Sequence, residues 1–279
     1  MKKQRYNIIY ILVLIGIALL SAVPILWALV LSLTPEYEMF KSTGSFLPGE
    51  MTFENYARLF QSGNSDSKIF YQAMINSINL AAYTIGVGLP LCTLSAYVLT
   101  KMEFGGKEAV KKVLIFTMAI PVFMTITPLY KIFASLRLLN NLFWISVIYV
   151  TAFLPLGTWL LSIHFESIPA EIEEAGRIDG ASRLQIFFHL LLPLSRSMMF
   201  SVFLIVFIMA WNQFQIPLIL ASNAVSKPIS VAVSEFVSKD SVRYGITAAS
   251  GLLAMLPPVF LAVLFKKYII LGIAGKDMD

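Results

Sequence analysis

The sequence predicts an all-α membrane protein that crosses the bilayer several times. Of its 279 residues, 58% are hydrophobic and only 13% are charged, and the mean hydropathy is +0.78. Soluble domains average roughly 45–50% apolar and about 25% charged residues, so this chain has too few charges to cover a soluble fold. The same composition excludes a disordered chain, because disordered chains have low hydrophobicity. Backbone groups in lipid must be hydrogen-bonded internally, and long apolar runs satisfy this as helices.

Six apolar segments are long enough to cross the hydrocarbon layer, which takes about 20 helical residues. They are residues 8–33, 70–99, 113–130, 142–163, 198–221 and 246–265. We expect six transmembrane helices in one domain over residues 1–279. The first segment follows Lys2, Lys3 and Arg5, as a signal peptide would. It is longer than the roughly 7–15 apolar residues of a signal core, so we expect it to be retained.

Lysine and arginine predict that both chain ends lie in the cytoplasm, because inner connections are enriched in them. The second and third segments, for example, are joined through Lys101, Lys107, Lys111 and Lys112. Basic residues beside the membrane segments account for the net charge of +5, so this charge does not indicate nucleic-acid binding. One cysteine and two histidines leave little material for a disulfide or a metal site. We therefore expect no catalytic residue, metal or cofactor on this chain.

Residues 164–197, between the fourth and fifth segments, are more than a simple connection needs. Their first part predicts a short helix, in which Pro169 suits the first turn and Arg177 the last. Gly180 then ends the helix, since glycine readily adopts positive φ.

The second part of this loop predicts another amphipathic helix. Ser182 and Gln185 are spaced as a capping box. An apolar stripe at helical spacing follows, comprising Leu184, Phe187, Phe188 and Leu191. Isolated helices this short are marginal in water, so the loop must pack either on its own membrane domain or on a separate cytoplasmic partner.

The same loop resembles the EAA loop of ABC-importer permeases. Glu174-Ala175-Gly176, Gly180 and Leu190-x-Leu192-Pro193 have the spacing of that motif, with Gly176 in place of the usual second alanine. Its flanks are similar to those of carbohydrate importers of the maltose-transporter permease type. Asn76-Ser77, Pro128-Leu-Tyr130 and Trp211-Asn212 resemble further landmarks, so the likeness extends over the whole chain.

The resemblance implies a type I importer permease fold in a bacterial-type cytoplasmic membrane. Such a permease pairs with a second permease to form a pathway for a sugar or oligosaccharide. Two ATP-binding subunits, which carry ATP and Mg, bind inside, and an extracytoplasmic solute-binding protein delivers the carbohydrate. Alternating access is coupled to the separate ATPase through the loop. The coupling residues would be Glu174, Ala175, Gly176, Asp179 and Gly180.

The expected substrate pathway contains polar and aromatic residues at membrane depth, because sugars bind through hydrogen bonds and aromatic faces. The candidates are Asn76, Asn79, Trp211, Asn212, Gln213 and Gln215. On the fifth segment, Asn212 and Gln213 are expected to share a face with Met209 and Ile216, and Trp211 and Gln215 to share the adjacent one. The alternative for these residues is hydrogen bonding between helices.

Two other functions fit part of the pattern. One is a related permease for a non-sugar or sugar-derived solute, such as a sugar phosphate or a polyol. The other is a self-sufficient secondary carrier or channel. It is disfavoured by the 164–197 loop and by spans nearly free of the ionisable residues that ion coupling needs. The chain is not expected to be an enzyme, since Gly105-Gly106-Lys107 lacks the remainder of a phosphate-binding loop.

Overall fold

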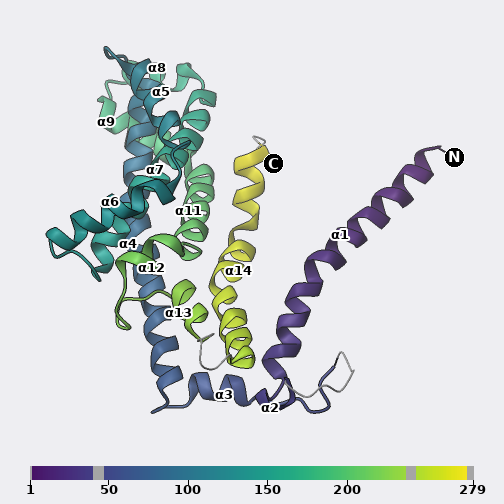
Figure 1. Ribbon diagram of the computed structural model, residues 1–279. Coiled ribbons are helices and arrows are strands. Elements are labelled where there is room, and N and C mark those ends of the chain that lie inside the picture. Colours follow the sequence, from purple (N-terminus) through teal and green to yellow (C-terminus); the bar gives the residue numbers. More distant parts are fainter. Residues whose placement is uncertain (1, 40–46, 237–242, 275–279) are drawn as a thin grey trace. The chain divides into compact units, whose positions relative to one another are not determined.

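The computed structural model describes residues 2–39, 47–236 and 243–274 (Figure 1). Within these ranges every regular element is a helix, which confirms the predicted all-α class. The chain divides into two compact units, residues 1–71 with 231–256 and residues 72–230 with 257–279. Residues 1 and 275–279, the predicted cytoplasmic ends, lie outside the described residues. The single domain over residues 1–279 stays a prediction.

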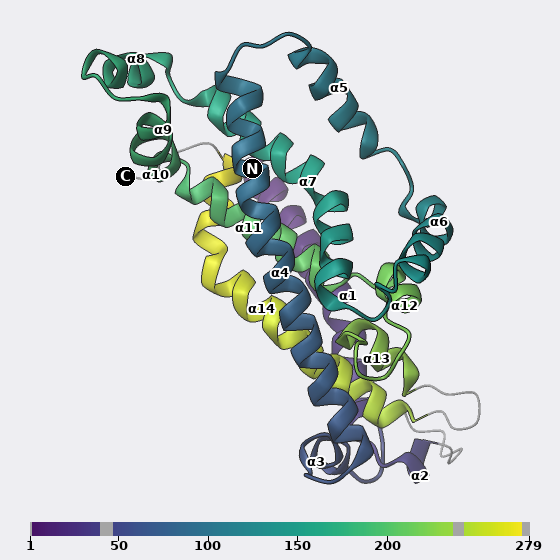
Figure 2. The same cartoon turned by 90° about the vertical axis from the view of Figure 1, so that its left-hand side faces the viewer.

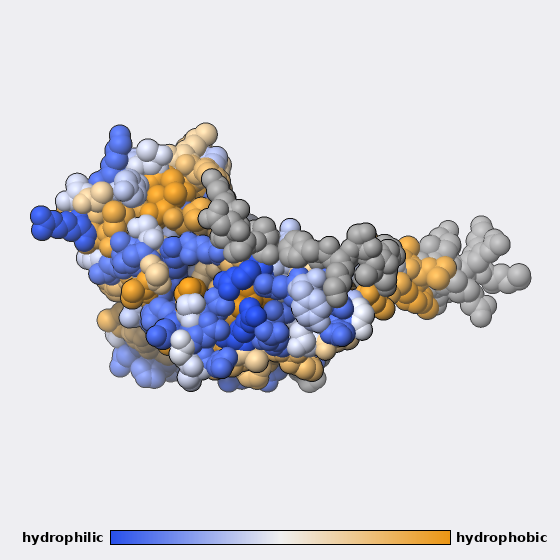
Figure 3. Space-filling model, turned by 60° about the horizontal axis from the view of Figure 1, so that its bottom comes forward, coloured by the Kyte–Doolittle hydropathy of each residue, from blue (hydrophilic) through white to orange (hydrophobic). Residues whose placement is uncertain are grey.

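The first unit is built around a long N-terminal helix and short helices that follow it. Its elements, some of which continue into the second unit, are α1 (Lys2–Leu33), α2 (Glu36–Met39), α3 (Glu54–Phe60), the start of α4 (Ser65–Lys101), α13 (Ile229–Glu235) and the start of α14 (Tyr244–Ala274). Between Tyr10 and Leu29 most apolar side chains of α1 are exposed, with Leu20 78% exposed, and they form the orange surface at the right of Figure 3. An outward apolar surface is what a lipid-facing helix requires.

The second unit holds most of the helix-on-helix packing (Figure 2). Its further elements are α5 (Lys107–Thr117), α6 (Val122–Ser135), α7 (Leu142–Ser167), α8 (Ala170–Ile178), α9 (Arg183–Ile186), the π-helix η1 (Phe187–Leu191), α10 (Leu192–Leu194), α11 (Arg196–Trp211) and α12 (Gln215–Leu220). Helix α7 packs along α11. At Gly157 a Cβ would lie 2.7 Å from Cys92 Sγ and 3.3 Å from Val202. A glycine there lets α4, α7 and α11 approach closely.

Four of the six expected spans are single long helices: Tyr10–Leu33, Ser65–Lys101, Leu142–Ser167 and Tyr244–Tyr268. The expected third span is bent instead, because α5 and α6 meet at 94° next to Pro121. Proline has no backbone N–H and clashes with the preceding turn. Another bend, of 73°, separates Arg183–Leu194 from α11. Counting each bent pair as one span gives up to six, so six spans are consistent with the structure.

Candidate functional site

The 164–197 loop folds into the two short helices that its sequence predicts. Gly180 follows α8 with a φ of +81°, and nothing lies within 4 Å of the position where a Cβ would be. The capping box is confirmed, since Ser182 N donates to Gln185 Oε1 at 2.8 Å and Gln185 N donates to Ser182 Oγ at 3.4 Å. Local sequence therefore sets both the end of α8 and the start of α9.

A π-turn changes the face that the second helix presents. Phe187 and Leu191 are buried, whereas Leu184 and Phe188 are 67% and 54% exposed. The predicted single apolar stripe is wrong at these two positions. Residues 187–191 form a π-helix, whose wider turn breaks the spacing of 3.6 residues on which the stripe was based.

Gly176 lies inside the loop, where it is covered by the following helices. A Cβ at this position would lie 3.0 Å from Leu190 Cδ1 and 3.1 Å from Ile186 Cγ1. The missing side chain thus lets α8 pack on α9 and η1. The other predicted coupling residues are exposed; they are Glu174, Ala175, Asp179 and Gly180. The five residues therefore divide into one that holds the loop together and four that face outward.

A buried ion pair attaches α8 to the end of α4, and the sequence reasoning missed it. Lys101 Nζ lies 2.8 Å from Glu173 Oε1, and the two side chains are 12% and 9% exposed. Lys101 also donates to the Ile168 carbonyl at 3.1 Å. Within α8, Arg177 Nη2 is 3.9 Å from Glu173 Oε2. The spacing of Glu173 and Arg177 was visible in the sequence, but the closer partner comes from a distant helix.

Of the six candidate pathway residues, Asn76 uses its side-chain amide for hydrogen bonds within the protein. It is 1% exposed. Its Nδ2 donates to the carbonyls of Val225 and Lys227 at 2.7 and 2.9 Å, and its Oδ1 accepts from Gln72 Nε2 at 3.0 Å. These contacts hold residues 225–227 against α4. Asn79 is partly exposed.

The candidate residues of the fifth segment lie at a break between two helices. Helix α11 ends at Trp211, and α12 begins at Gln215. The faces predicted for a continuous helix are therefore wrong. Trp211 is buried and stacks on Phe207 with ring centroids 5.4 Å apart. Asn212 is exposed, and Gln213 and Gln215 are partly exposed.

A cavity of about 270 Å³ lies between the bend of α5 and α6 and helices α7 and α12. Ile120, Leu129, Ile148 and Ile216 line it together with three threonines and two further apolar residues. Each threonine hydroxyl donates to a carbonyl of its own helix. None of the six candidate pathway residues lines this cavity. The residues described by the structure also include no group of three or more His, Cys, Asp or Glu side chains suited to a metal ion.

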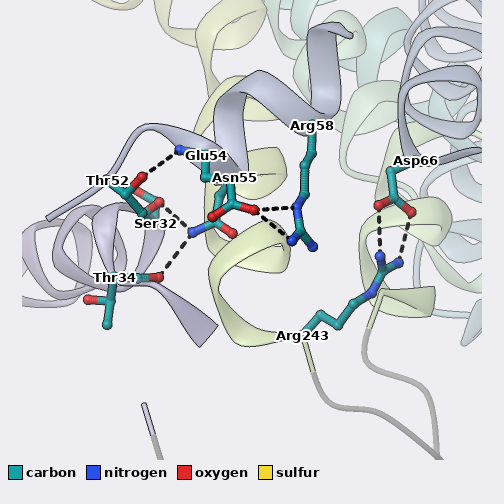
Figure 4. Close-up of polar contacts among 8 residues, drawn as sticks. All are labelled: Ser32, Thr34, Thr52, Glu54, Asn55, Arg58, Asp66 and Arg243. Atoms are coloured by element: carbon teal, nitrogen blue, oxygen red, sulfur yellow. Dashed lines mark hydrogen bonds and ion pairs between the residues drawn. The ribbon is translucent and has the colours of Figure 1, made fainter. Parts of the chain in front are cut away.

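The first unit has its own polar cluster, shown in Figure 4. Asn55 is 3% exposed, and its Nδ2 donates to the carbonyls of Ser32 and Thr34 at 3.0 and 3.1 Å. These carbonyls end α1, where intrahelical partners are missing. Arg243 forms two hydrogen bonds with Asp66, at 2.7 and 2.9 Å, and these raise the pKa of Arg243. Asn55 thus attaches α3 to the end of α1, and the Asp66–Arg243 pair attaches the start of α4 to the residue before α14.

These features describe a helical membrane protein, in which a structured loop lies between α7 and α11. Residues 88–274 match the family described as "Binding-protein-dependent transport system inner membrane component". The chain belongs to this family, whose members are the membrane components of ABC importers. The recognition of the family from the 164–197 loop is confirmed.

Similar proteins cover nearly the whole chain. The trehalose transport system permease protein SugB of Mycobacterium tuberculosis is 28% identical over 98% of this chain and 97% of its own length. The trehalose/maltose permease MalG of Thermococcus litoralis is 29% identical over 95% of each. The sn-glycerol-3-phosphate permease UgpE of Yersinia pestis is 26% identical over 96% and 95%.

The fold also matches that of a solved transporter. In the crystal structure of a bacterial ABC transporter that imports the polysaccharide alginate, one chain has a TM-score of 0.80 to this chain at 22% identity. The alignment covers 96% of this chain and 98% of that chain. This likeness shows the importer permease fold.

Proposed function

We propose that this chain is the permease subunit of an ATP-driven importer for a sugar or oligosaccharide, and that the 164–197 loop docks on the ATPase. The observation that carries the proposal is the outward face of α8. Glu174, Ala175, Asp179 and Gly180 are exposed on it, while Glu173 and Gly176 hold it to the rest of the unit. Ile178, 85% exposed, adds apolar surface for a partner to bury.

The proposed orientation places this loop and both chain ends in the cytoplasm. Lys101, Lys107, Lys111 and Lys112 lie at the same end of the second unit as α8, because Lys101 pairs with Glu173. Basic residues favour the cytoplasmic side. The outward face of α8 would then meet an ATP-binding subunit, which supplies the hydrolysis that this chain does not carry out.

We propose that the solute contacts this chain at the break between α11 and α12. Interrupted membrane helices are where many transporters bind their solutes, because unwound backbone and polar side chains become accessible there. Asn212, Gln213 and Gln215 lie at this break and are at least partly exposed. Carbohydrate as the solute is supported by the trehalose and maltose permeases among the relatives.

The two asparagines should therefore respond differently to replacement. We expect Asn212→Ala to lower uptake in an assembled complex, since an exposed amide is lost from the pathway. Asn76→Ala should instead lower the unfolding temperature of the solubilised protein by several degrees, because its two hydrogen bonds to the part-buried 225–227 segment are lost at about 0.5–1.5 kcal/mol each. Uptake kinetics and thermal unfolding are measured on both. Normal uptake by Asn212→Ala would remove it from the pathway.

The main test is purification of the tagged chain from its native membrane in mild detergent. We expect a second permease and an ATP-binding subunit to be recovered with it. Glu174→Arg should abolish recovery of the ATP-binding subunit and leave membrane insertion intact, since it reverses a charge on the docking face. Recovery of the chain alone, with ATP-independent solute movement in liposomes, would mean a carrier or channel.

A second candidate is a permease for a sugar-derived polar solute, and the glycerol-phosphate permease among the relatives favours it. The purified complex distinguishes the two. Its ATPase rate, measured with its binding protein, should rise with a mono- or oligosaccharide. A rise only with glycerol phosphate or another phosphate ester would establish the second candidate.

A further inference from the structure

We propose that Lys101 and Glu173 form the link through which movement of α8 reaches α4. This inference rests on the proposed function, in which α8 docks on the ATPase. The pair would be a positioning device, distinct from the exposed residues that would make the docking contacts.

Helix α4 needs such a link because it is not a sequence neighbour of the loop. The chain runs from α7 into α8, and from α10 into α11, so movement of the loop reaches α7 and α11 through the backbone. Helix α4 ends at Lys101, far earlier in the sequence. It can follow the loop only through side-chain contacts.

Lys101 makes those contacts with two elements at once. Its ammonium group lies 2.8 Å from Glu173 on α8 and 3.1 Å from the carbonyl of Ile168, the residue directly after α7. Both charged side chains are nearly buried, so water screens their attraction little. Removing one partner would leave an uncompensated buried charge, which strongly disfavours separation. The ends of α4, α7 and α8 should therefore move as one body.

One turn earlier, Tyr97 of α4 reaches the second half of the loop. Its ring lies 4.7 Å from the ring of Phe187, and its hydroxyl is 3.5 Å from the Arg183 carbonyl oxygen. Tyr97 and Lys101 are four residues apart and so share one face of α4. This face holds both halves of the loop, but Glu173 provides the charged contact that a conservative substitution can remove selectively.

The test separates docking from transmission by measuring both in the complete complex. Glu173→Gln keeps the shape of the side chain and removes its charge. We expect this variant to retain the ATP-binding subunit as the unmodified protein does. Solute moved per ATP hydrolysed in liposomes should fall by about fivefold or more, the lower end of couplings between distinct sites. Glu171→Gln, an exposed carboxylate on the same helix, is the matched control and should change neither quantity.

Rescue by exchange of the charges provides the second measurement. Glu173→Lys should lower the transport ratio further, and Lys101→Glu combined with Glu173→Lys should restore part of it. A normal ratio for Glu173→Gln would overturn the inference. So would loss of the ATP-binding subunit by that variant, because the pair would then only shape the docking surface. If the unmodified chain retains no ATP-binding subunit, the proposed function itself fails.

Discussion

Replacing Gly245 with alanine is expected to displace the Asn55 side chain and destabilise the first unit. A Cβ at Gly245 would lie 2.4 Å from Asn55 Nδ2 and 2.9 Å from its Cγ and Oδ1. Asn55 has little freedom to move, because it is buried and donates to the carbonyls of Ser32 and Thr34. The methyl group would break these hydrogen bonds. We expect a loss of about 2–3 kcal/mol, the cost of leaving buried polar groups unsatisfied.

Gly251→Ala is the matched control for this substitution, because it makes the same change in the same helix. Nothing lies within 4 Å of a Cβ at Gly251. Alanine in a helix is more favourable than glycine by about 0.5–1 kcal/mol, so this variant should unfold at an equal or higher temperature. Thermal unfolding of the solubilised proteins measures both. Equal unfolding temperatures for Gly245→Ala and the unmodified chain would show that Asn55 does not fix the end of α1.

Replacing Gly180 with valine is expected to have the largest effect on transport. The φ of +81° disfavours most residues with a Cβ by about 1–2 kcal/mol, β-branched residues most and asparagine least. A cost of this size would lower the ratio of correctly folded to misfolded loop about 5–30-fold. ATP-driven uptake should fall with it, while the amount of protein in the membrane stays unchanged.

Two further variants separate backbone conformation from side-chain size. Gly180→Asn should transport nearly normally, because asparagine tolerates positive φ. Gly63→Val places the same strain elsewhere, since Gly63 has a φ of +94° and open space around it, and it should leave the transport per ATP unchanged. If Gly180→Val and Gly180→Asn transport alike, the left-handed turn is not needed for coupling.

Features set by residues close together in the sequence were predicted, and features set by distant residues were not. Hydropathy predicted the four long spans, and the Ser182–Gln185 pair predicted its own capping box, because both signals are local. The 94° bend beside Pro121 was not predicted. An apolar run gives the length of a helix in the membrane, but it does not give its direction.

Contacts between distant segments were beyond prediction from one sequence. Lys101 was counted as one of several basic flanking residues, and only the fold brings it to Glu173. Asn76 has a polar side chain of the kind that binds sugars, but its amide donates hydrogen bonds to residues 225–227, which pack on α4. The motif identified the 164–197 loop, whereas the attachment of this loop to α4 depends on tertiary structure.

The π-turn at 187–191 makes the direction of the following chain depend on residue count. Its closing hydrogen bond runs from Leu192 N to the Phe187 carbonyl, one residue wider than in an α-helix. An α-helix advances about 100° per residue, so if these same residues formed an ordinary α-helix, everything after them would be rotated by about that angle. Leu191 would leave its buried position, and α11 would start on a different heading. A one-residue gap at this point in an alignment would therefore signal that the π-turn is replaced by an α-turn, with the direction of α11 kept.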